Sequence, residues 1–379
     1  MKRTSDHSEQ RLFREEVLSF TSHIYMTLAI LCRRRHKVAF IAELNLKFSS
    51  RFLRQRNACG MEISVKQTSD LCLRAPGTNW AGARTCAEMR SNMINETISM
   101  QMPGSLPESR LITYIQDTYP EVDIPSRPLV LICPGGAYAY TSPREGEAFA
   151  MQFLSMGFHA AVLKYSCAPA VYPTALTELA SAIKLIREKA DEWHVDKVIV
   201  LGCSAGGHLA ASMGVFWQEA FLAEAVGLKA EENEILRPDG MILCYPVITS
   251  GEFAHRGSMD NLLGADRCMD ATWLEKMSLE KHVTEKVPKA FIWHTFTDGS
   301  VPVENSLMFV SALRKAGVNT EFHMYPVGGH GLGLANRLTQ NPGGTAIQEE
   351  CTSWITLVKT WLEKQFVETE QGGNRDSLS

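Results

Sequence analysis

The chain has 379 residues, of which 45% are hydrophobic and 21% charged, a composition typical of a soluble globular protein. Its formal net charge of −4 is mild and indicates no nucleic-acid partner. The ten cysteines show neither metal-ligand spacing nor closely paired intervals, which favours reduced, packed thiols in a cytoplasmic protein over a disulfide-bonded or metal-binding class.

Charge is divided unevenly along the chain. Residues 1–92 hold 16 Lys and Arg against 8 Asp and Glu, whereas residues 93–379 hold 22 against 34. Such asymmetry can indicate a basic arm. However, the apolar run 24–32 is well below the ~20 residues of a membrane helix, and no signal-peptide cleavage pattern follows it. We therefore expect no membrane partner and interpret residues 1–92 as a basic N-terminal extension, non-globular or non-native; a genuine basic appendage is the alternative.

From residue 93 onward, strand and helix patterns alternate as in a doubly wound sheet. This alternation predicts an α/β domain over residues 93–367, with a mostly parallel sheet flanked by helices, and the polar residues 368–379 as a disordered tail. The expected strands are 98–102, 111–115, 129–133, 160–165, 198–201, 241–245, 290–295 and 321–325. The main expected helices are 174–192, 303–316 and one carrying the apolar positions of 354–362.

A further helix start is marked after the third strand. Ser142 is placed as N-cap, Pro143 at the first helical position and Glu145 as the residue that closes a capping box. This interpretation explains Glu145 and Glu147 locally and gives them no catalytic role.

The segment Gly202-Cys203-Ser204-Ala205-Gly206 lies between an apolar strand and a helix-compatible stretch. This is the setting of a nucleophile elbow, in which a sharp strand-to-helix turn exposes the central hydroxyl and small neighbours let the two elements approach. Ser204 is therefore the candidate nucleophile, and a plain Gly-rich turn is the alternative. Cys203 is a weaker rival because the elbow exposes the residue after it.

A serine hydroxyl needs a histidine base and an orienting carboxylate, which follow later in the chain on this fold. His330 lies between glycines after a predicted strand, and this freedom lets its imidazole reach the nucleophile. The other histidines considered lie in predicted strands or in the helix after the elbow (His294, His323 and His208). Asp298 begins the loop after a buried strand and is the candidate acid; a turn aspartate is its alternative.

The oxyanion of the tetrahedral intermediate needs hydrogen-bond donors. The amide after the nucleophile, that of Ala205, is one candidate, and the loop Pro134-Gly135-Gly136-Ala137-Tyr138 offers the amides of Gly136 and Ala137. Lipases and esterases carry H-G-G-G at this loop, and the departure matters because alanine tolerates a positive φ less well than glycine.

The part least constrained by the fold is residues 247–287, which we predict to be a short cap bordering the acyl pocket; an ordinary surface connection with one helix is the alternative. Candidate residues of the substrate pocket are Tyr138, Trp273, Val301 and Pro302.

Five stretches between roughly residues 93 and 366 carry a family resemblance: Cys133–Tyr138, Ser142–Glu147, Gly202–Gly207, Trp293–Leu307 and Gly328–Ala335. They resemble the α/β-hydrolase fold esterases, and within these the bacterial acetyl esterase or acetylxylan-esterase-like branch of carbohydrate esterases. The resemblance puts nucleophile, acid and base on Ser204, Asp298 and His330, which the chemistry also indicates. It implies that small acyl groups, typically acetyl, are removed from sugar hydroxyls.

These features together predict a serine hydrolase that cleaves small acyl esters of acetylated sugars or xylo-oligosaccharides through an acyl-serine intermediate. The chemistry requires no metal and no organic cofactor. The alternatives are a general short-chain carboxylesterase, a prolyl-oligopeptidase-like peptidase, for which no paired acidic motif for a peptide N-terminus stands out, and a non-catalytic binding protein of the same fold. The acyl length limit, the alcohol and the oligomeric state stay open.

Overall fold

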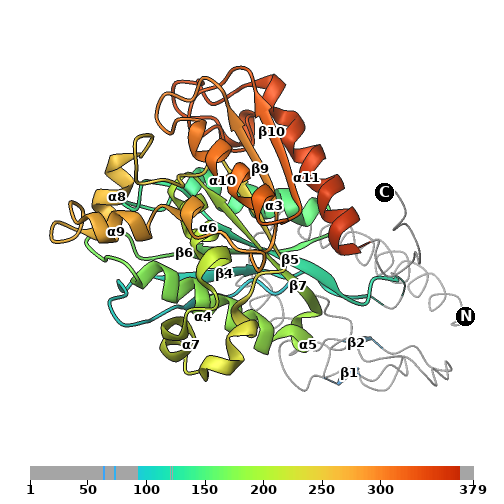
Figure 1. Cartoon of the computed structure of the whole chain (residues 1–379). Helices are drawn as coiled ribbons and strands as arrows, with labels where there is room; N and C mark the ends of the chain where they lie inside the picture. The colour runs from blue at the N-terminus through green and yellow to red at the C-terminus, as the bar shows by residue number, and fades with distance from the viewer. Residues whose placement is uncertain (1–62, 65–71, 74–92, 120, 122, 368–379) are drawn as a thin grey trace, which may run out of the picture. The chain divides into compact units, whose positions relative to one another are not determined.

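The computed structural model describes residues 63–64, 72–73, 93–119, 121 and 123–367 (Figure 1). The chain divides into a unit of residues 1–90 and a unit of residues 91–379. In the first unit the described residues form one antiparallel pair, β1 (Ile63–Ser64) with β2 (Cys72–Leu73). The predictions for residues 1–92 and 368–379 otherwise fall outside the described residues.

The second unit is built on an eight-stranded sheet with the order β10-β9-β8-β7-β5-β6-β4-β3. The strands from β5 to β10 pair in parallel, whereas β3 and β4 are antiparallel at one edge. The strands are β3 (Thr97–Ser99), β4 (Arg110–Tyr114), β5 (Arg127–Cys133), β6 (His159–Lys164), β7 (Val195–Cys203), β8 (Gly240–Cys244), β9 (Lys289–Thr295) and β10 (Thr320–Tyr325). The prediction of a mostly parallel α/β sheet is confirmed.

The two faces of the sheet are covered by different helices (Figure 1). Leu129 and Leu131 of β5 pack with α4 (Thr174–Glu188), α6 (Ala205–Phe216) and α10 (Glu304–Lys315). The alternate residues Val130 and Ile132 pack with α3 (Glu147–Ser155) and α11 (Trp354–Leu362). Alternation along a strand sends successive side chains to opposite faces, and burial on both faces explains why the central strands are continuous apolar runs.

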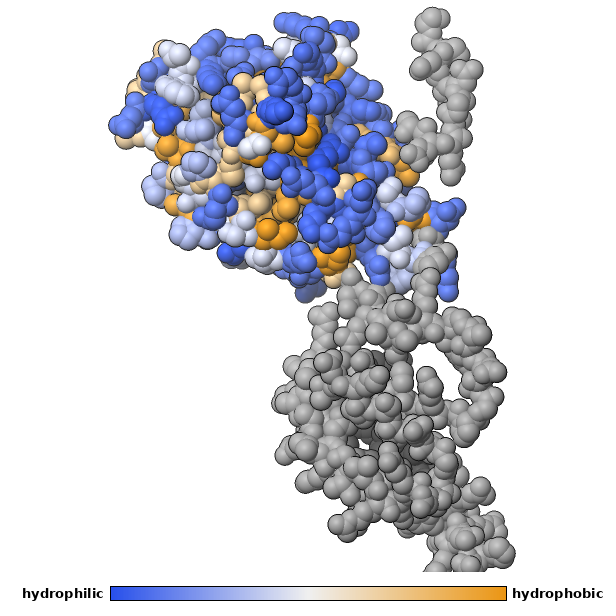
Figure 2. All heavy atoms as spheres, turned by 90° about the horizontal axis from the view of Figure 1, so that it is seen from below, coloured by the Kyte–Doolittle hydropathy of each residue, from blue (hydrophilic) through white to orange (hydrophobic). Residues whose placement is uncertain are grey.

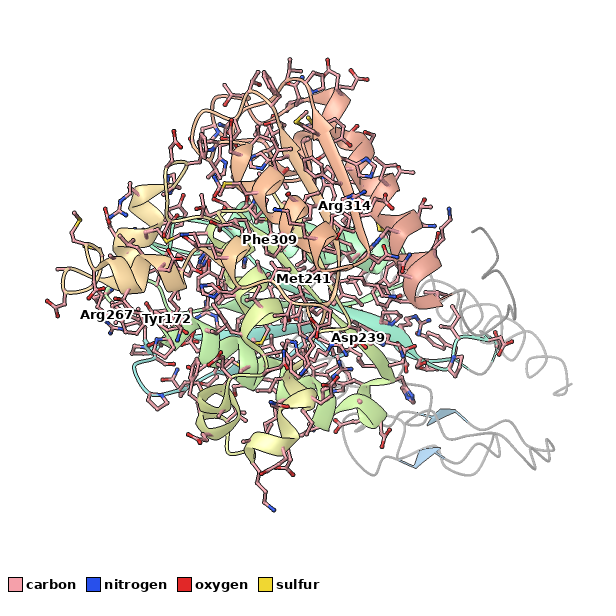
Figure 3. All side chains as sticks on the ribbon, in the orientation of Figure 1. Tyr172, Asp239, Met241, Arg267, Phe309 and Arg314 are labelled. Atoms are coloured by element: carbon pink, nitrogen blue, oxygen red, sulfur yellow. The ribbon has the colours of Figure 1, made fainter. Side chains whose placement is uncertain are left out.

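Figure 3 labels Met241 of β8 and Phe309 of α10, two core residues of the layer that holds α4, α6 and α10.

Shorter helical segments connect the strands and the main helices. The connecting segments are α5 (Ala190–Trp193), α7 (Ala220–Ala225) and the short helical turns η1 (Pro143–Glu145), η2 (Ala230–Leu236), η4 (Arg337–Thr339), η5 (Glu349–Ser353) and η6 (Glu363–Val367). No described helix is long and apolar enough to cross a membrane.

The predicted capping box at Ser142 is wrong. Ser142 makes no side-chain cap hydrogen bond, Pro143 begins a short 3-10 turn, and the α-helix starts only at Glu147. The reason is that the Glu145 side chain is buried and bonds to other parts of the molecule, so it does not reach back to the backbone of Ser142.

The segment 247–287 holds α8 (Arg256–Leu263), α9 (Ala271–Lys276) and the turn η3 (Leu279–Lys281). Figure 1 shows α8 and α9 together at one edge of the domain. Figure 2 shows a face of the domain on which polar side chains predominate and apolar ones lie in patches among them.

Asn305 at the start of α10 fastens this segment to the domain. Its Oδ1 accepts the N–H groups of Ile248 and Thr249 at 2.9 and 3.1 Å, and its Nδ2 donates to the carbonyls of Phe253 and Pro302 at 2.9 and 3.0 Å. The side chain is fully buried, so its four hydrogen bonds have no water to replace them.

We expect Asn305→Ala to lower the free energy of unfolding by about 2–4 kcal/mol, because it leaves buried amides and carbonyls without partners. Urea unfolding followed by circular dichroism measures this change. Asn319→Ala, at an exposed position before β10, is the matched control and should stay within about 0.5 kcal/mol of the parent. Equal stability of the two variants would contradict the anchoring role of Asn305.

Candidate active site

Ser204 stands at the turn between β7 and α6 with φ 54° and ψ −119°. This sparsely populated conformation, with its positive φ, is costly for a residue with a side chain, on the order of 1–3 kcal/mol, and it holds the hydroxyl out of the turn. The turn requires glycine at positions 202 and 206, because a side chain at either would overlap the backbone. A Cβ on Gly206 would lie 2.1 Å from the carbonyl oxygen of Cys133, and one on Gly202 would lie 2.1 Å from that of Gly206.

The structure brings the three residues of the predicted triad together. The Ser204 Oγ lies 2.7 Å from Nε2 of His330, and Nδ1 of His330 lies 2.7 Å from Oδ2 of Asp298. Asp298 follows β9, and His330 lies in the loop after β10. The hydroxyl, the imidazole and the carboxylate therefore form one hydrogen-bonded series built from three separate strand ends.

Asp298 is held by donors on both carboxylate oxygens. Its Oδ1 accepts the N–H groups of Ser300 and Val301, each at 2.9 Å, while Oδ2 faces both His330 and, at 3.3 Å, Nε2 of His294. Burial alone would raise the pKa of Asp298, but hydrogen bonds from His294 and His330, the charge of His330 and the Val301 amide hold it well below its usual value. The carboxylate thus stays ionised where an imidazolium would need it.

His294 is a residue whose role the sequence does not reveal. It is fully buried in β9, Nδ1 lies 2.8 Å from the Ser306 hydroxyl, and Nε2 lies 3.0 Å from the carbonyl of Val301 as well as near Asp298. Its position inside a predicted strand indicates an ordinary core or surface histidine. Only the fold shows that its ring faces the same carboxylate oxygen of Asp298 as His330 does.

The loop after β5 has an unusual backbone. Gly136, Ala137 and Tyr138 have φ values of 132°, 56° and 55°, so the alanine does adopt the left-handed conformation that glycine would tolerate better. Within the described part of the chain, the amides of Gly136, Ala137 and Ala205 donate to no protein acceptor. They are therefore available to a ligand, and Asn261 of α8 steadies the loop by donating from Nδ2 to the carbonyl of Ala137 at 2.9 Å.

The predicted pocket residues Tyr138 and Trp273 lie in well-packed surroundings. Tyr138 is buried, with its hydroxyl 3.0 Å from Nδ1 of His208. Trp273 in α9 packs against Tyr172, with the Arg267 guanidinium 4.8 Å from the centre of its ring. Figure 3 labels Tyr172 and Arg267, whose Nη1 donates to the Tyr172 carbonyl at 3.1 Å.

The other two predicted pocket residues lie beside the acid. The buried Val301 donates its amide to Asp298 and accepts a hydrogen bond from His294, and the carbonyl of Pro302 accepts one from Asn305. A role of these four residues in lining a substrate pocket stays a prediction.

No sequence motif marks His255, the N-cap residue of α8 in the segment 247–287. Its Nδ1 accepts the Ser258 amide at 3.2 Å, so the proton of a neutral ring is on Nε2. Its pKa is lowered chiefly by burial and then by the charge of His330, against a raising effect of Asp298. Among the described residues, no three His, Cys, Asp or Glu side chains are grouped so that they could hold a metal ion.

A family model, BD-FAE, matches residues 117–313, just over half of the chain. This chain belongs to the BD-FAE family. Endo-1,4-beta-xylanase B of Butyrivibrio fibrisolvens is 36% identical over 220 residues, which are 55% of this chain and 33% of that protein. The acetylxylan esterase of Xylanibacter ruminicola is 28% identical over 216 residues, 55% of this chain and 42% of that protein. The chain thus spans between a third and a half of the length of these curated relatives.

A solved structure resembles the chain over most of its own length. The acetyl ester-xyloside bifunctional hydrolase from Caldicellulosiruptor lactoaceticus matches with a TM-score of 0.60 and 33% identity, covering 71% of this chain and 96% of that one. The family match and these relatives confirm the resemblance to α/β-hydrolase esterases that the sequence indicates.

We expect the buried His208 of this BD-FAE protein to make the fold acid-sensitive. Burial lowers the pKa of His208 from 6.5 to about 4, against a raising hydrogen bond to the carbonyl of Met277. The unfolded chain therefore takes up a proton first, so the stability present above pH 6.5 falls as pH drops toward 4, by up to about 3 kcal/mol.

The slope of unfolding free energy against pH, measured by urea unfolding between pH 7.5 and 4.5, tests this. His208→Gln should be less stable at pH 7.5 but should show a flatter slope than the parent. Ser155→Ala, an exposed change that removes no titratable group, is the control and should keep the slope of the parent. Parallel slopes for all three proteins would refute the assignment.

Proposed function

We propose that this protein is a serine esterase that removes small acyl groups, acetyl in particular, from the hydroxyls of acetylated sugars or xylo-oligosaccharides. The observation that carries the proposal is the hydrogen-bonded series from the Ser204 hydroxyl through His330 to Asp298, with 2.7 Å at each link. In this role Ser204 is the nucleophile, His330 the base and Asp298 the acid that fixes the imidazole.

The first half of the reaction is the transfer of the acyl group to the enzyme. His330 takes the proton from Ser204 as the oxygen attacks the ester carbonyl, and the imidazolium then protonates the departing alcohol. Asp298 accepts the Nδ1–H of His330, so Nε2 is the nitrogen that faces the serine. In the second half, water attacks the acyl-serine through the same proton transfers and releases the carboxylic acid.

The oxyanion of each tetrahedral intermediate is stabilised by the amides of Gly136, Ala137 and Ala205. Their lack of a protein acceptor within the described residues supports this role. The positive φ at Ala137 is an energetic cost that the fold bears in the resting state, so the donors need not reorganise during the reaction.

The substrate class is inferred from the relatives and from one side chain. The names of the relatives include an acetylxylan esterase, a xylanase and an acetyl ester-xyloside hydrolase. Tyr140, whose amide bonds to the carbonyl of Gly136, is 61% exposed next to the candidate donors. An exposed aromatic ring beside the loop of the candidate donors suits the flat C–H face of a pyranose.

The cytoplasm is the location we propose. Six cysteines of the described part of the chain are free thiols, five of them buried, and burial raises the pKa of Cys133 and Cys203 above its usual value. Buried free thiols fit a reducing compartment.

Ser204→Ala should reduce kcat for p-nitrophenyl acetate by at least about 10³-fold, because the nucleophile is removed while the fold is retained. Labelling of the protein by a fluorophosphonate probe should disappear in the same variant. Ser155→Ala, at an exposed position in α3, is the control and should keep both properties. Persistent labelling of Ser204→Ala would assign the nucleophile to another residue.

A substrate panel separates the esterase classes. We expect kcat/KM to be highest for acetylated xylo-oligosaccharides, to remain measurable for p-nitrophenyl acetate, and to fall at least about tenfold by the octanoate ester, since one methylene is worth ~1–3 kcal/mol in a matched pocket. Equal rates on acetyl, butyryl and octanoyl esters, with no gain from the sugar, would indicate a general carboxylesterase. Cleavage of aminoacyl amides would indicate a peptidase.

A further inference from the structure

Glu145 is a buried carboxylate, 3% exposed, between the oxyanion loop and the loop of the base. Its Oε2 accepts the N–H of Gly135 at 2.8 Å, and its Oε1 accepts the hydroxyl proton of Tyr245 at 2.7 Å. The two donors lie 10 and 100 positions away from Glu145 in the sequence, so the carboxylate connects separate parts of the active site.

On the oxyanion side, the contact is with the residue directly before the candidate donors. A Cβ added at Gly135 would lie 2.8 Å from Oε2 of Glu145 and 3.0 Å from Cβ of Ser204. The backbone at Gly135 is therefore held between the carboxylate and the nucleophile. Its hydrogen bond to Glu145 fixes the start of the turn in which Gly136 and Ala137 present their amides.

On the side of the base, the link runs through Tyr245, which follows β8 and is almost fully buried. The Tyr245 hydroxyl accepts the N–H of Gly333 at 3.0 Å while it donates to Glu145. Its ring meets the imidazole of His330 edge to face, with the ring centres 5.3 Å apart. Tyr245, held by Glu145, thus contacts the loop of the base twice: at the backbone of Gly333 and at the imidazole ring of His330.

Within the described residues no Lys or Arg forms an ion pair with Glu145. The adjacent Arg144 points elsewhere and donates to the carbonyls of Gly331 and Thr339 at 3.0 and 2.7 Å. Burying a carboxylate without a cation costs desolvation free energy that an apolar side chain at the same core position would not. The contacts on both of its oxygens lead to the reacting groups rather than to a structural partner.

We propose that Glu145 is a positioning residue for the esterase reaction, acting on the oxyanion amides through Gly135 and on the base through Tyr245 and Gly333. The inference rests on the function proposed above and adds a fourth side chain to the three of the triad. It acts through other groups and touches neither the substrate nor the reacting atoms.

The variants of Glu145 separate its two contacts. Glutamine keeps one acceptor oxygen for the Gly135 amide, but its NH₂ group then faces the Tyr245 hydroxyl. That hydroxyl must accept where it now donates, while it also accepts the Gly333 amide, so the Tyr245 link is altered and the Gly135 link is kept. Alanine removes both links. We expect kcat for p-nitrophenyl acetate to fall about tenfold in Glu145→Gln and about 10²–10³-fold in Glu145→Ala, the range found when an oxyanion donor is lost. KM should change by less than about threefold, because the substrate contacts remain.

Tyr245→Phe isolates the link on the side of the base. It keeps the ring against His330 but removes the hydroxyl that bridges Glu145 and Gly333. We expect a kcat loss close to that of Glu145→Gln, with KM again nearly unchanged. Labelling of Ser204 by a fluorophosphonate should slow in parallel, since the phosphoryl oxygen uses the same amides.

The experiment measures kcat, KM, labelling rate and urea unfolding for the full chain and each variant, with Glu147→Gln as matched control. Glu147 is exposed two residues later, and its variant should keep the properties of the parent. Variants of Glu145 that are folded and have kcat within twofold of Glu147→Gln overturn the proposal. So does unfolding of both Glu145→Gln and Glu145→Ala, because the carboxylate then serves the fold. If only the alanine variant unfolds, the test rests on the glutamine variant: a kcat within twofold of Glu147→Gln overturns the proposal, and a larger loss supports it.

The parent protein separates this proposal from the function on which it rests. A parent that neither hydrolyses acetyl esters nor reacts with the probe refutes the esterase. An active parent with equally active Glu145 variants refutes the positioning role alone.

Discussion

The arrangement of the active site depends on one close approach of backbone to backbone. At the end of β7 the chain turns into α6 so sharply that Gly206 touches the carbonyl oxygen of Cys133 on the neighbouring strand. Any side chain at Gly206 would push the helix away from the sheet. Because the contact joins the turn that carries Ser204 to the strand that leads into the loop of Gly136 and Ala137, the positions of the proposed nucleophile and of the proposed donor amides are set together.

Much of the fold and the convergence of three side chains could be predicted from local patterns. Each central strand is an apolar run long enough to be buried on both faces, and such runs separated by amphipathic helices leave few arrangements other than a parallel sheet. Ser204, Asp298 and His330 each follow a strand of that sheet. The carboxyl ends of parallel strands meet at one edge, so the order along the chain was sufficient to bring these residues together.

The supporting residues could not be predicted in this way, because their partners are distant in sequence. Glu145 fits a capping box by spacing, and only the folded chain shows that its side chain turns inward to Gly135 and Tyr245 instead. His294 has the pattern of a strand residue, and nothing local reveals that Asp298, four positions later, faces the same ring. Propensity and capping rules describe neighbours along the chain, whereas these contacts depend on which loops the sheet places side by side.

The bond from Asn261 to the carbonyl of Ala137 has a consequence for how the enzyme could change. Helix α8 lies in the segment 247–287 and is fastened through Asn261 to the carbonyl of Ala137, the residue whose own N–H is a proposed oxyanion donor. Substitutions in α8 that move Asn261 would therefore also disturb the backbone at Ala137. In this architecture a change of substrate range made through α8 would also change the turnover rate, because both depend on the hydrogen bond from Asn261 to Ala137.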